Sequence, residues 1–337
     1  MAAPMIPPEG AAQFLARHGW AGAGVAPLAG DASFRRYFRV SDGARTAVLM
    51  DAPPEQEDAR PFLAIAHHLR QLGLSAPDAL AAEPDAGLVL LEDFGDDRLT
   101  PLLAGRPDLE PGLYAAAIDI LAEIQRHPAP PGVPDYDLNE LRREVLLFTE
   151  WYLPALDPTT RPGAADPGGF LEAWNGAFAY AVGWPGVLVL RDYHADNLMW
   201  LPHREGVRAL GLLDFQDARV GQRAYDLVSL LQDARRDVSP DLEAAMIDRF
   251  LAATRPRDPA RFAASYAVLG AQRQTKILGI FARLWKRDGK PGYRRFMGRV
   301  WAHLERDLAH PALLPVARWF DAHVPPHARA PAWTRHA

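Results

Sequence analysis

The spacing of hydrophobic residues divides the chain into a strand-rich beginning and a helical remainder. Thr46–Asp51 is typical of a buried strand, and Gly87–Gly95 is typical of a strand that runs into a polar segment. Leu28–Val40 joins small turn residues to an alternating stretch, which predicts two strands and the turn between them. Apolar residues also recur at helical spacing in Ala11–Gly19 and Glu55–Leu72, so we expect two helices beside these strands.

After residue 95 the apolar residues mostly follow the helical period, and proline-rich breaks separate the segments. The expected helices are Gly112–Gln125, Asn139–Leu153, Gly169–Val182, Tyr225–Ala234, Asp241–Ala253 and Phe262–Trp285. A chain of 337 residues, 49% of them hydrophobic, can fill two cores. We therefore predict an α+β fold in two lobes. A small β-rich N-terminal lobe would cover residues 1–93, and a large helical C-terminal lobe would cover residues 94–337.

A predicted hairpin inside the helical part brings polar residues together. Two short apolar runs, Leu198–Leu201 and Val207–Leu213, flank a polar turn that contains proline and glycine. In an antiparallel hairpin the start of the first strand lies beside the end of the second. Asn197 and Asp214 occupy these two positions, so their side chains should converge, and Asp192 lies on the loop just before them.

This order of residues indicates phosphoryl transfer. A kinase-like site needs one carboxylate to orient the attacking hydroxyl, together with an asparagine and a second aspartate that hold Mg²⁺ against the nucleotide phosphates. We assign Asp192 to the hydroxyl proton, and Asn197 and Asp214 to the metal. Each aspartate alone is more often a solvated residue at a turn. The complete order is uncommon: a strand followed by an aspartate, then an asparagine, a hairpin and a second aspartate.

Two neighbours of Asp192 have alternative interpretations. For Arg191 the favoured one is an ion pair with Asp226, since buried ion pairs commonly brace such loops. His194 is either a group of the site or a partner in a loop hydrogen bond, and the sequence favours neither.

The nucleotide is expected to contact three segments of the N-terminal lobe. Its phosphates would lie under a flap whose backbone N–H groups bind them, and its base would lie at the hinge, where peptide groups bind the adenine edge. The flap residues are Gly30, Asp31, Ala32 and Ser33, and the hinge residues are Glu92, Asp93 and Phe94. A kinase also grips the phosphates with a lysine on the strand that here is Thr46–Asp51, but Met50 stands at that position.

The first lobe contains no lysine at all, so any cation on the phosphates must be an arginine. Arg35, Arg36 and Arg39 are the nearest in sequence, and Arg36 is included among the candidate nucleotide-binding residues. Which of them acts there stays open. Glu57 in the following helix is either a brace for that arginine or part of a solvated helix face.

Composition excludes several other classes of function. The net charge of −5 gives no broad basic field, so nucleic acid is not an expected partner. With no cysteine, the chain has no disulfides, thiol catalysis or cysteine zinc sites, which fits a cytoplasmic location. No uncharged apolar run is long enough for a membrane helix, and the N-terminus lacks the pattern of a signal peptide.

Taken together, these motifs resemble the aminoglycoside phosphotransferase/choline kinase superfamily, from about Leu28 to about Tyr293. The chain looks most like the bacterial N-acetylmuramate/N-acetylglucosamine anomeric kinases of peptidoglycan recycling. The segments behind that likeness are Gly30–Arg39, Met50–Glu55, Leu190–Leu198, Leu213–Ala218 and Lys276–Leu284. Leu190, where many superfamily members have histidine, and the missing lysine both look normal for the narrower family.

The resemblance implies a protein-kinase-like fold, ATP and Mg²⁺ as cofactors, and Asp192, Asn197 and Asp214 in the roles given above. The narrower family implies that the C1 hydroxyl of an amino sugar is phosphorylated. The resulting sugar 1-phosphate would supply a uridylyltransferase.

Several polar residues are candidates for the sugar site. Gln272, Lys276, Gly279 and Arg283 share one stripe of a predicted helix, and such a stripe either binds substrate or is simply solvated. Further candidates are His194, Asp217 and Arg219. The carboxylate of muramate calls for a cation, and the sequence does not choose among Lys276, Arg219 and Arg283.

Two alternative functions remain at this point. The protein could phosphorylate another small hydroxyl compound, such as an aminoglycoside or choline, although no acidic cluster for a cationic substrate is apparent. The missing lysine would also fit a nucleotide-binding pseudokinase, but the positions for the proton acceptor and both metal ligands are all filled.

Overall fold

The computed structural model describes residues 5–28, 34–156 and 167–330. Contacts within the chain divide it into two compact units. The first comprises Met1–Ala116 and Asp196–Asp217, and the second comprises Ala117–Ala195 and Ala218–Ala337. The hairpin predicted around Asn197 and Asp214 therefore belongs to the same unit as the N-terminal strands. The division into lobes at residue 93 remains a prediction.

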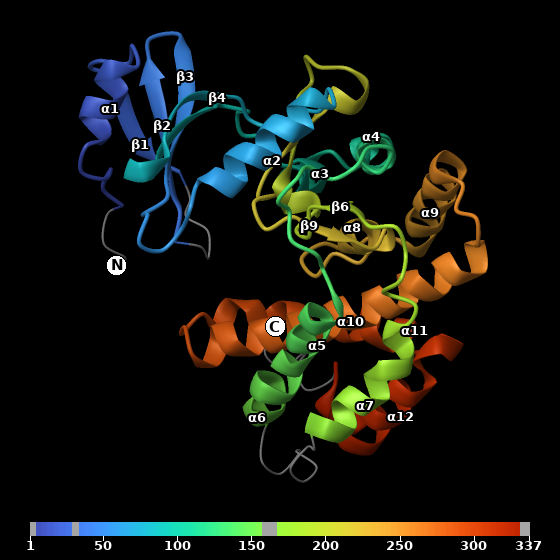
Figure 1. Cartoon of the computed structure of the whole chain (residues 1–337). Helices are drawn as coiled ribbons and strands as arrows, with labels where there is room; N and C mark the ends of the chain where they lie inside the picture. The colour runs from blue at the N-terminus through green and yellow to red at the C-terminus, as the bar shows by residue number, and fades with distance from the viewer. Residues whose placement is uncertain (1–4, 29–33, 157–166, 331–337) are drawn as a thin grey trace. The chain divides into compact units, whose positions relative to one another are not determined.

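The first unit is built on a five-stranded sheet in which every neighbouring pair is antiparallel (Figure 1). The strand order is β1 (Gly24–Pro27), β2 (Arg36–Asp42), β3 (Arg45–Asp51), β5 (Leu88–Glu92) and β4 (Ala79–Glu83). The predicted strands at Thr46–Asp51 and from Gly87 onward are confirmed. The expected turn at Gly30–Ser33 lies outside the described residues.

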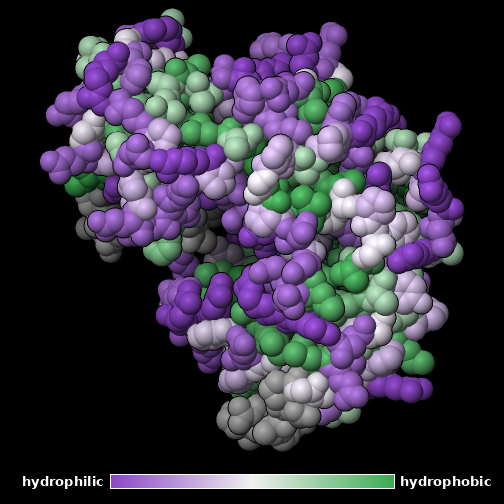
Figure 2. All heavy atoms as spheres, viewed as in Figure 1, coloured by the Kyte–Doolittle hydropathy of each residue, from purple (hydrophilic) through white to green (hydrophobic). Residues whose placement is uncertain are grey.

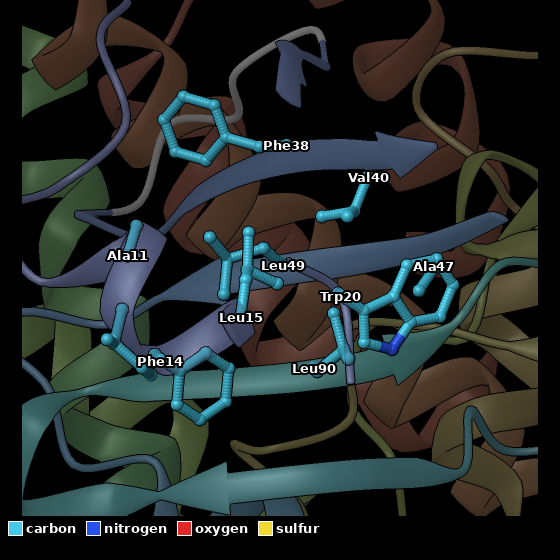
Figure 3. Packing of buried hydrophobic residues seen from close by; sticks show 10 residues of the cluster. Ala11, Phe14, Leu15, Trp20, Phe38, Val40, Ala47, Leu49 and Leu90 are labelled. Carbon is cyan, nitrogen blue, oxygen red and sulfur yellow. The ribbon is translucent and has the colours of Figure 1, made fainter. Parts of the chain in front are cut away.

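A short helix covers one face of this sheet. Helix α1 (Ala11–Arg17) supplies Phe14 and Leu15, and Trp20 follows it in the chain. Figure 3 shows these three side chains lying against the strands. The strand residues of this cluster alternate along β2, β3 and β5, as expected for one face of a sheet, and are Phe38, Val40, Ala47, Leu49, Leu88 and Leu90. Burial of these side chains drives the association, because a fully buried Leu, Val or Phe side chain gains about 1.5–3 kcal/mol on leaving water.

The second helix of this unit, α2 (Arg60–Gln71), begins later than predicted. The sequence interpretation placed its start at Glu55, which would put Pro61 inside the helix. Proline has no N–H to donate, so it is tolerated only in the first turn, where the structure has it. The residues before it form a turn in which the N–H groups of Gln56 and Glu57 bond to the Pro53 carbonyl oxygen. The remaining elements of the unit are α3 (Leu99–Gly105), β7 (Leu198–Trp200) and β8 (Leu210–Leu212).

The second unit is mainly helical, as predicted. Its helices are α5 (Leu138–Leu147), α6 (Leu153–Ala155), α7 (Pro167–Phe178), α8 (Ala224–Leu231), α9 (Pro240–Thr254), α10 (Pro259–Lys286), α11 (Met297–Leu308) and α12 (Leu314–His323). Helix α4 (Glu110–Ile124) spans the boundary of the units, and the strands β6 (Val187–Val189) and β9 (Arg219–Gly221) pair antiparallel. All six predicted helical segments are confirmed. Helices α11 and α12 were not predicted, although Val300, Trp301 and Leu304 carry a helical period.

Helix α10 is the central helix of this unit. It contacts α5, α8 and α11 and is buried along most of its length (Figure 1). A cluster of aromatic rings packs around Phe148, which stacks on Tyr152 with centroids 4.7 Å apart. The Phe320 ring meets Phe148 edge-on at 5.2 Å, so the geometry is that expected for aromatic pairs in a core.

Gly279 lets α10 approach α5 closely. A Cβ at this position would lie 2.4 Å from the backbone carbon of Leu147. We therefore expect Gly279→Ala to destabilise the protein by about 1–3 kcal/mol, because backbone atoms cannot move aside as a flexible side chain can. Gly298 in α11 is the matched control, since a Cβ there would meet nothing within 4 Å. Gly298→Ala should stabilise by up to about 1 kcal/mol through helix propensity. Urea unfolding of both variants tests this, and equal effects would contradict the packing role of Gly279.

The surface is mostly polar. On the face seen in Figure 2, hydrophilic residues are spread widely, with smaller hydrophobic areas between them. The large hydrophobic residues that are exposed in the described ranges are Ile6, Phe34, Leu80 and Leu314. Among the described residues, no helix combines the length and hydrophobicity that crossing a bilayer requires.

Candidate active site

The predicted hairpin forms and brings its two polar residues together. Strands β7 and β8 pair antiparallel, and the Leu213 N–H donates to the Asn197 carbonyl oxygen at 3.0 Å. The Asn197 side chain then donates from Nδ2 to Asp214 Oδ2 at 3.3 Å. Gln216, to which the sequence interpretation gave no role, donates from Nε2 to Asp214 Oδ1 at 3.0 Å. Both carboxylate oxygens of Asp214 are thus oriented by side-chain amides.

These residues fit a hard cation such as Mg²⁺. Magnesium prefers oxygen ligands, and it usually takes one or two from protein carboxylates and the others from water and phosphate. Asp214 offers a carboxylate and Asn197 an amide oxygen at the open end of the same hairpin. The Oε1 atom of Gln216 is buried and has no hydrogen-bond partner in the described chain. Across the same residues there is no group of three or more His, Cys, Asp or Glu side chains that could hold a metal.

Backbone strain occurs at one predicted site residue and next to another. Among the described residues, three non-glycine residues have positive φ, and two of them are Arg191 at 70° and Asp214 at 57°. The left-handed conformation costs such residues about 1–3 kcal/mol and persists only where the surroundings enforce it. We infer that the two residues keep this conformation because it directs their side chains.

Asp226, in α8, holds the loop that carries Asp192. Its Oδ2 accepts the Leu190 N–H at 2.6 Å, and its Oδ1 accepts the Arg191 N–H at 2.9 Å. Burial raises the pKa of Asp226 to about 7, against the opposing effect of these two N–H groups. The predicted ion pair between the Arg191 side chain and Asp226 is therefore wrong. Asp226 satisfies the loop backbone, and the guanidinium turns elsewhere.

The Arg191 side chain instead joins a buried network around Glu144 of α5. The guanidinium donates to Glu144 Oε1 at 2.6 Å, and the Lys276 ammonium lies 2.8 Å from the same oxygen. Gln272 Nε2 donates to Glu144 Oε2 at 3.0 Å, and the Tyr136 hydroxyl donates to it as well. Burial opposes ionisation of Glu144, but Lys276 and Arg191 lower its pKa to about 2.

This Glu144 network corrects the interpretation of the α10 polar stripe. Gln272 is fully buried and Lys276 nearly so, so this part of the stripe is not solvated; it faces α5. Glu144 itself was missed by the sequence analysis. The available signal was its place among the apolar residues Leu141 and Val145, on the buried face of α5.

Asp192 is 41% exposed, next to a second buried cation. Arg273 donates from Nη1 to the Arg191 carbonyl oxygen at 3.0 Å, and its Nη2 lies 3.9 Å from Asp192 Oδ1. Burial alone would raise the pKa of Asp192, but the positive charges of Arg273 and Lys276 lower it below its usual range. Asp192 is therefore a carboxylate at neutral pH. Arg273 was not predicted, although Gln272 beside it was.

His194 has a hydrogen-bonding partner on its own unit. Its ring is buried, and Nε2 lies 3.4 Å from Arg235 Nη1. Burial and the charge of Arg235 lower the pKa of His194, so the ring is neutral and Nε2 is the acceptor.

The other sugar-site candidates lie at different places. Asp217 is exposed, Arg219 is half-buried and donates to the carbonyl oxygen of Ala218, and Arg283 is half-buried beyond Gly279 on α10.

The side chains of the predicted hinge are engaged in contacts within the first unit. Arg204 pairs with the Glu92 carboxylate and lies over the Phe94 ring, 5.3 Å from its centroid. The Phe94 ring also packs on β8 so closely that a Cβ at Gly211 would lie 2.5 Å from it. These contacts hold the side chains of the segment in place, and its role as the hinge stays a prediction.

The candidate arginines of the first unit take different partners. Arg36, 40% exposed, donates from Nε to Asp51 Oδ2 at 2.7 Å. Arg39 pairs with the carboxylate of Asp93 at 2.8 Å and with that of Asp96 at 2.9 Å. The flap residues Gly30, Asp31, Ala32 and Ser33 lie outside the described part of the chain.

Comparison with known proteins places these features in a family. The sequence model described as "Phosphotransferase enzyme family" matches residues 24–264. The N-acetylmuramate/N-acetylglucosamine kinase of Caulobacter vibrioides is 40% identical, and the alignment covers 94% of this chain and 97% of that protein. The kinase of the same name from Pseudomonas aeruginosa is 38% identical over 84% of this chain and 83% of its own length.

Solved structures share the fold. A choline/ethanolamine kinase family protein from Mesorhizobium loti has a TM-score of 0.62 at 17% identity, covering 92% of this chain and 95% of that chain. The ADP-bound aminoglycoside phosphotransferase APH(2'')-Ib has a TM-score of 0.55 at 14% identity, covering 88% and 97%. The predicted α+β, protein-kinase-like fold is confirmed by these likenesses. A family match over most of the chain and curated relatives that align along nearly all of it lead to one conclusion: the chain belongs to the phosphotransferase enzyme family.

Proposed function

We propose that this phosphotransferase uses ATP to phosphorylate the C1 hydroxyl of N-acetylmuramate and N-acetylglucosamine. The observation that carries the proposal is the name shared by its curated relatives. Four proteins named N-acetylmuramate/N-acetylglucosamine kinase align with 34–40% identity over 81–94% of this chain. The hairpin and the loop before it supply residues suited to that chemistry. The choline and aminoglycoside kinases share the fold at lower identity, which supports no choice of substrate.

In the proposed reaction Asp192 acts on the sugar. Its carboxylate orients the C1 hydroxyl and accepts its proton while the hydroxyl oxygen forms a bond to the γ-phosphorus of ATP. The bond from that phosphorus to the bridging oxygen breaks, ADP leaves, and the proton passes to solvent. The lowered pKa of Asp192 keeps it ionised but makes it a weak base. Its main contribution is therefore to position the hydroxyl, and proton acceptance follows as the new bond forms.

The metal and nucleotide residues follow from the same proposal. Asn197 and Asp214 would hold Mg²⁺, which neutralises charge on the phosphates when bound. Gln216 holds the Asp214 carboxylate in place through Oδ1. The proposed nucleotide-binding residues are Gly30, Asp31, Ala32, Ser33, Arg36, Glu92, Asp93 and Phe94.

Six residues are proposed to bind the sugar. They are His194, Asp217, Arg219, Gln272, Lys276 and Arg283, and within this set Gln272 and Lys276 already bind Glu144. Since ATP is the phosphate donor, we also propose a cytoplasmic location. The sugar 1-phosphate product would then be consumed by a uridylyltransferase.

An activity assay tests the function. Purified protein with Mg-ATP would be given one of four compounds: N-acetylmuramate, N-acetylglucosamine, choline or kanamycin. We expect both amino sugars to be phosphorylated, phosphorus NMR to place the phosphate on C1, and EDTA to abolish turnover. Absence of turnover with either amino sugar would overturn the proposal. A phosphate on C6 would overturn only the anomeric assignment, and turnover of choline or kanamycin alone would favour the alternative kinases.

A further inference from the structure

The position on β3 where a kinase carries its phosphate-gripping lysine holds Met50. Met50 of β3 is fully buried and pairs with Tyr37 of β2, so this position supplies only an apolar side chain. A cation must therefore reach the phosphates from another element. The sequence left three arginines as candidates, Arg35, Arg36 and Arg39, and the structure separates them by burial and partner.

Arg35 is the most buried of the three. It lies directly before β2, and its side chain is 6% exposed. Its Nε donates to Glu57 Oε2 at 2.5 Å, so the glutamate before α2 braces it. Its Nη1 atom is buried and has no hydrogen-bond partner in the described chain. A charged N–H group left in this state is unfavourable, so Nη1 is suited to an anionic ligand.

The charge of Arg35 also acts at the candidate metal position. Burial works against the charged guanidinium, but Tyr37, Glu57 and Asp214 together raise the pKa of Arg35 above its usual value. Asp214 is the carboxylate that faces Asn197 across the hairpin. Arg35 therefore lies within electrostatic reach of the place where metal-bound phosphates are expected.

Neither of the other two arginines has these properties. Arg36 is 40% exposed and is neutralised by Asp51, and Arg39 is neutralised by Asp93 and Asp96. Within the described ranges Arg35 has one carboxylate partner, Glu57, which engages its Nε and leaves the other edge of the planar guanidinium for a phosphate.

We propose that Arg35 grips the nucleotide phosphates in place of the missing lysine, and that Glu57 positions it. This inference rests on the proposed nucleotide-dependent phosphoryl transfer. The pair Arg35–Glu57 then does what a lysine–glutamate pair does in kinases, but its cation comes from the start of β2. Both residues belong to the first unit, as do Asn197 and Asp214.

Direct nucleotide binding without sugar tests the inference. Binding of Mg-ATP, ADP and adenosine would be measured by calorimetry for wild type, Arg35→Met and Arg35→Lys. For Arg35→Met we expect the affinity for Mg-ATP to fall by about 10- to 100-fold, the loss of one charge-assisted contact, with adenosine binding unchanged. Arg35→Lys should recover part of the loss. Glu57→Gln should raise the KM for ATP by a smaller factor than Arg35→Met does. It should leave the KM for the sugar unchanged.

Arg60→Gln is the matched control. It removes a guanidinium from the same unit, but Arg60 is exposed and pairs with the exposed Asp58 and Asp85. Its nucleotide binding should equal that of wild type.

The outcomes separate the two proposals. A wild type that neither binds Mg-ATP nor phosphorylates any offered compound overturns the proposed function. An active wild type together with an Arg35→Met variant that binds Mg-ATP equally well overturns the role of Arg35 alone. Equal losses for adenosine and Mg-ATP would show a merely structural role and also overturn it. If Arg35→Met does not fold, Arg35→Lys decides, because it keeps the charge but not the planar fork, and unchanged Mg-ATP binding in that variant counts against the inference.

Discussion

Replacing Asp192 with asparagine is expected to reduce turnover of the amino sugar by about 10²- to 10⁴-fold while nucleotide binding stays unchanged. An amide has nearly the shape of a carboxylate, so the loop should keep its structure, including the contact with Arg273. It cannot accept the hydroxyl proton, and its NH₂ group can meet the hydroxyl as a donor. The kcat with saturating Mg-ATP and the Kd for Mg-ATP are the two measurements.

Asp248→Asn is the control for this prediction. Asp248 is exposed on α9 in the same unit and lies 56 residues from Asp192 in the sequence, so the same change of charge is made outside the loop. Its kcat should equal that of wild type. An Asp192→Asn enzyme that retains full turnover would show that another group orients the hydroxyl.

Replacing Glu144 with glutamine is expected to destabilise the second unit by about 3–5 kcal/mol. Glu144 is 1% exposed and offsets two buried cations, Arg191 and Lys276. A neutral amide leaves both charges uncompensated and places its own NH₂ group beside their donors. Urea unfolding measures the free-energy difference. Turnover should also fall, because Arg191 precedes Asp192 and its side chain would lose its anchor.

Glu140→Gln is the matched control, one turn earlier in α5. Glu140 pairs with Arg143 on the surface, and such pairs contribute about 0–1 kcal/mol. A loss in Glu140→Gln equal to that in Glu144→Gln would mean that burial of the Glu144 network has no special energetic weight.

The pH dependence of the Glu144→Gln effect gives a second check. The folded pKa of Glu144 is about 2, below its ordinary value of 4.5. A carboxyl whose pKa is depressed on folding contributes stability above the unfolded pKa, and loses that contribution as pH falls toward the folded pKa. The advantage of wild type over Glu144→Gln should therefore shrink from pH 4.5 downward and be constant at higher pH.

Local patterns predicted the elements well and their ends less well. Six helical segments and the β7–β8 hairpin follow from the spacing of apolar residues, which depends only on near neighbours in the chain. The predicted start of α2 was wrong because the prediction followed the apolar period and did not take account of Pro61. The late helices α11 and α12 were missed even though the period continues there.

Charged side chains were harder to predict. The motif correctly placed Asn197 beside Asp214, because a short hairpin determines that contact. The sequence interpretation also predicted an ion pair between the Arg191 side chain and Asp226, which the structure contradicts. Glu144, the actual partner, lies 47 residues away in the sequence, and nothing local connects the two.

The sequence by itself determined the α+β class, the order of its elements and the candidate residues for phosphoryl transfer, since backbone periodicity and motif spacing are local properties. Only the tertiary structure decided which charge each buried residue meets: Glu144 with Arg191 and Lys276, and Arg35 with Glu57. The physical reason is that an ion pair depends on distance in space and on exclusion of water, and both arise only when separate elements pack together.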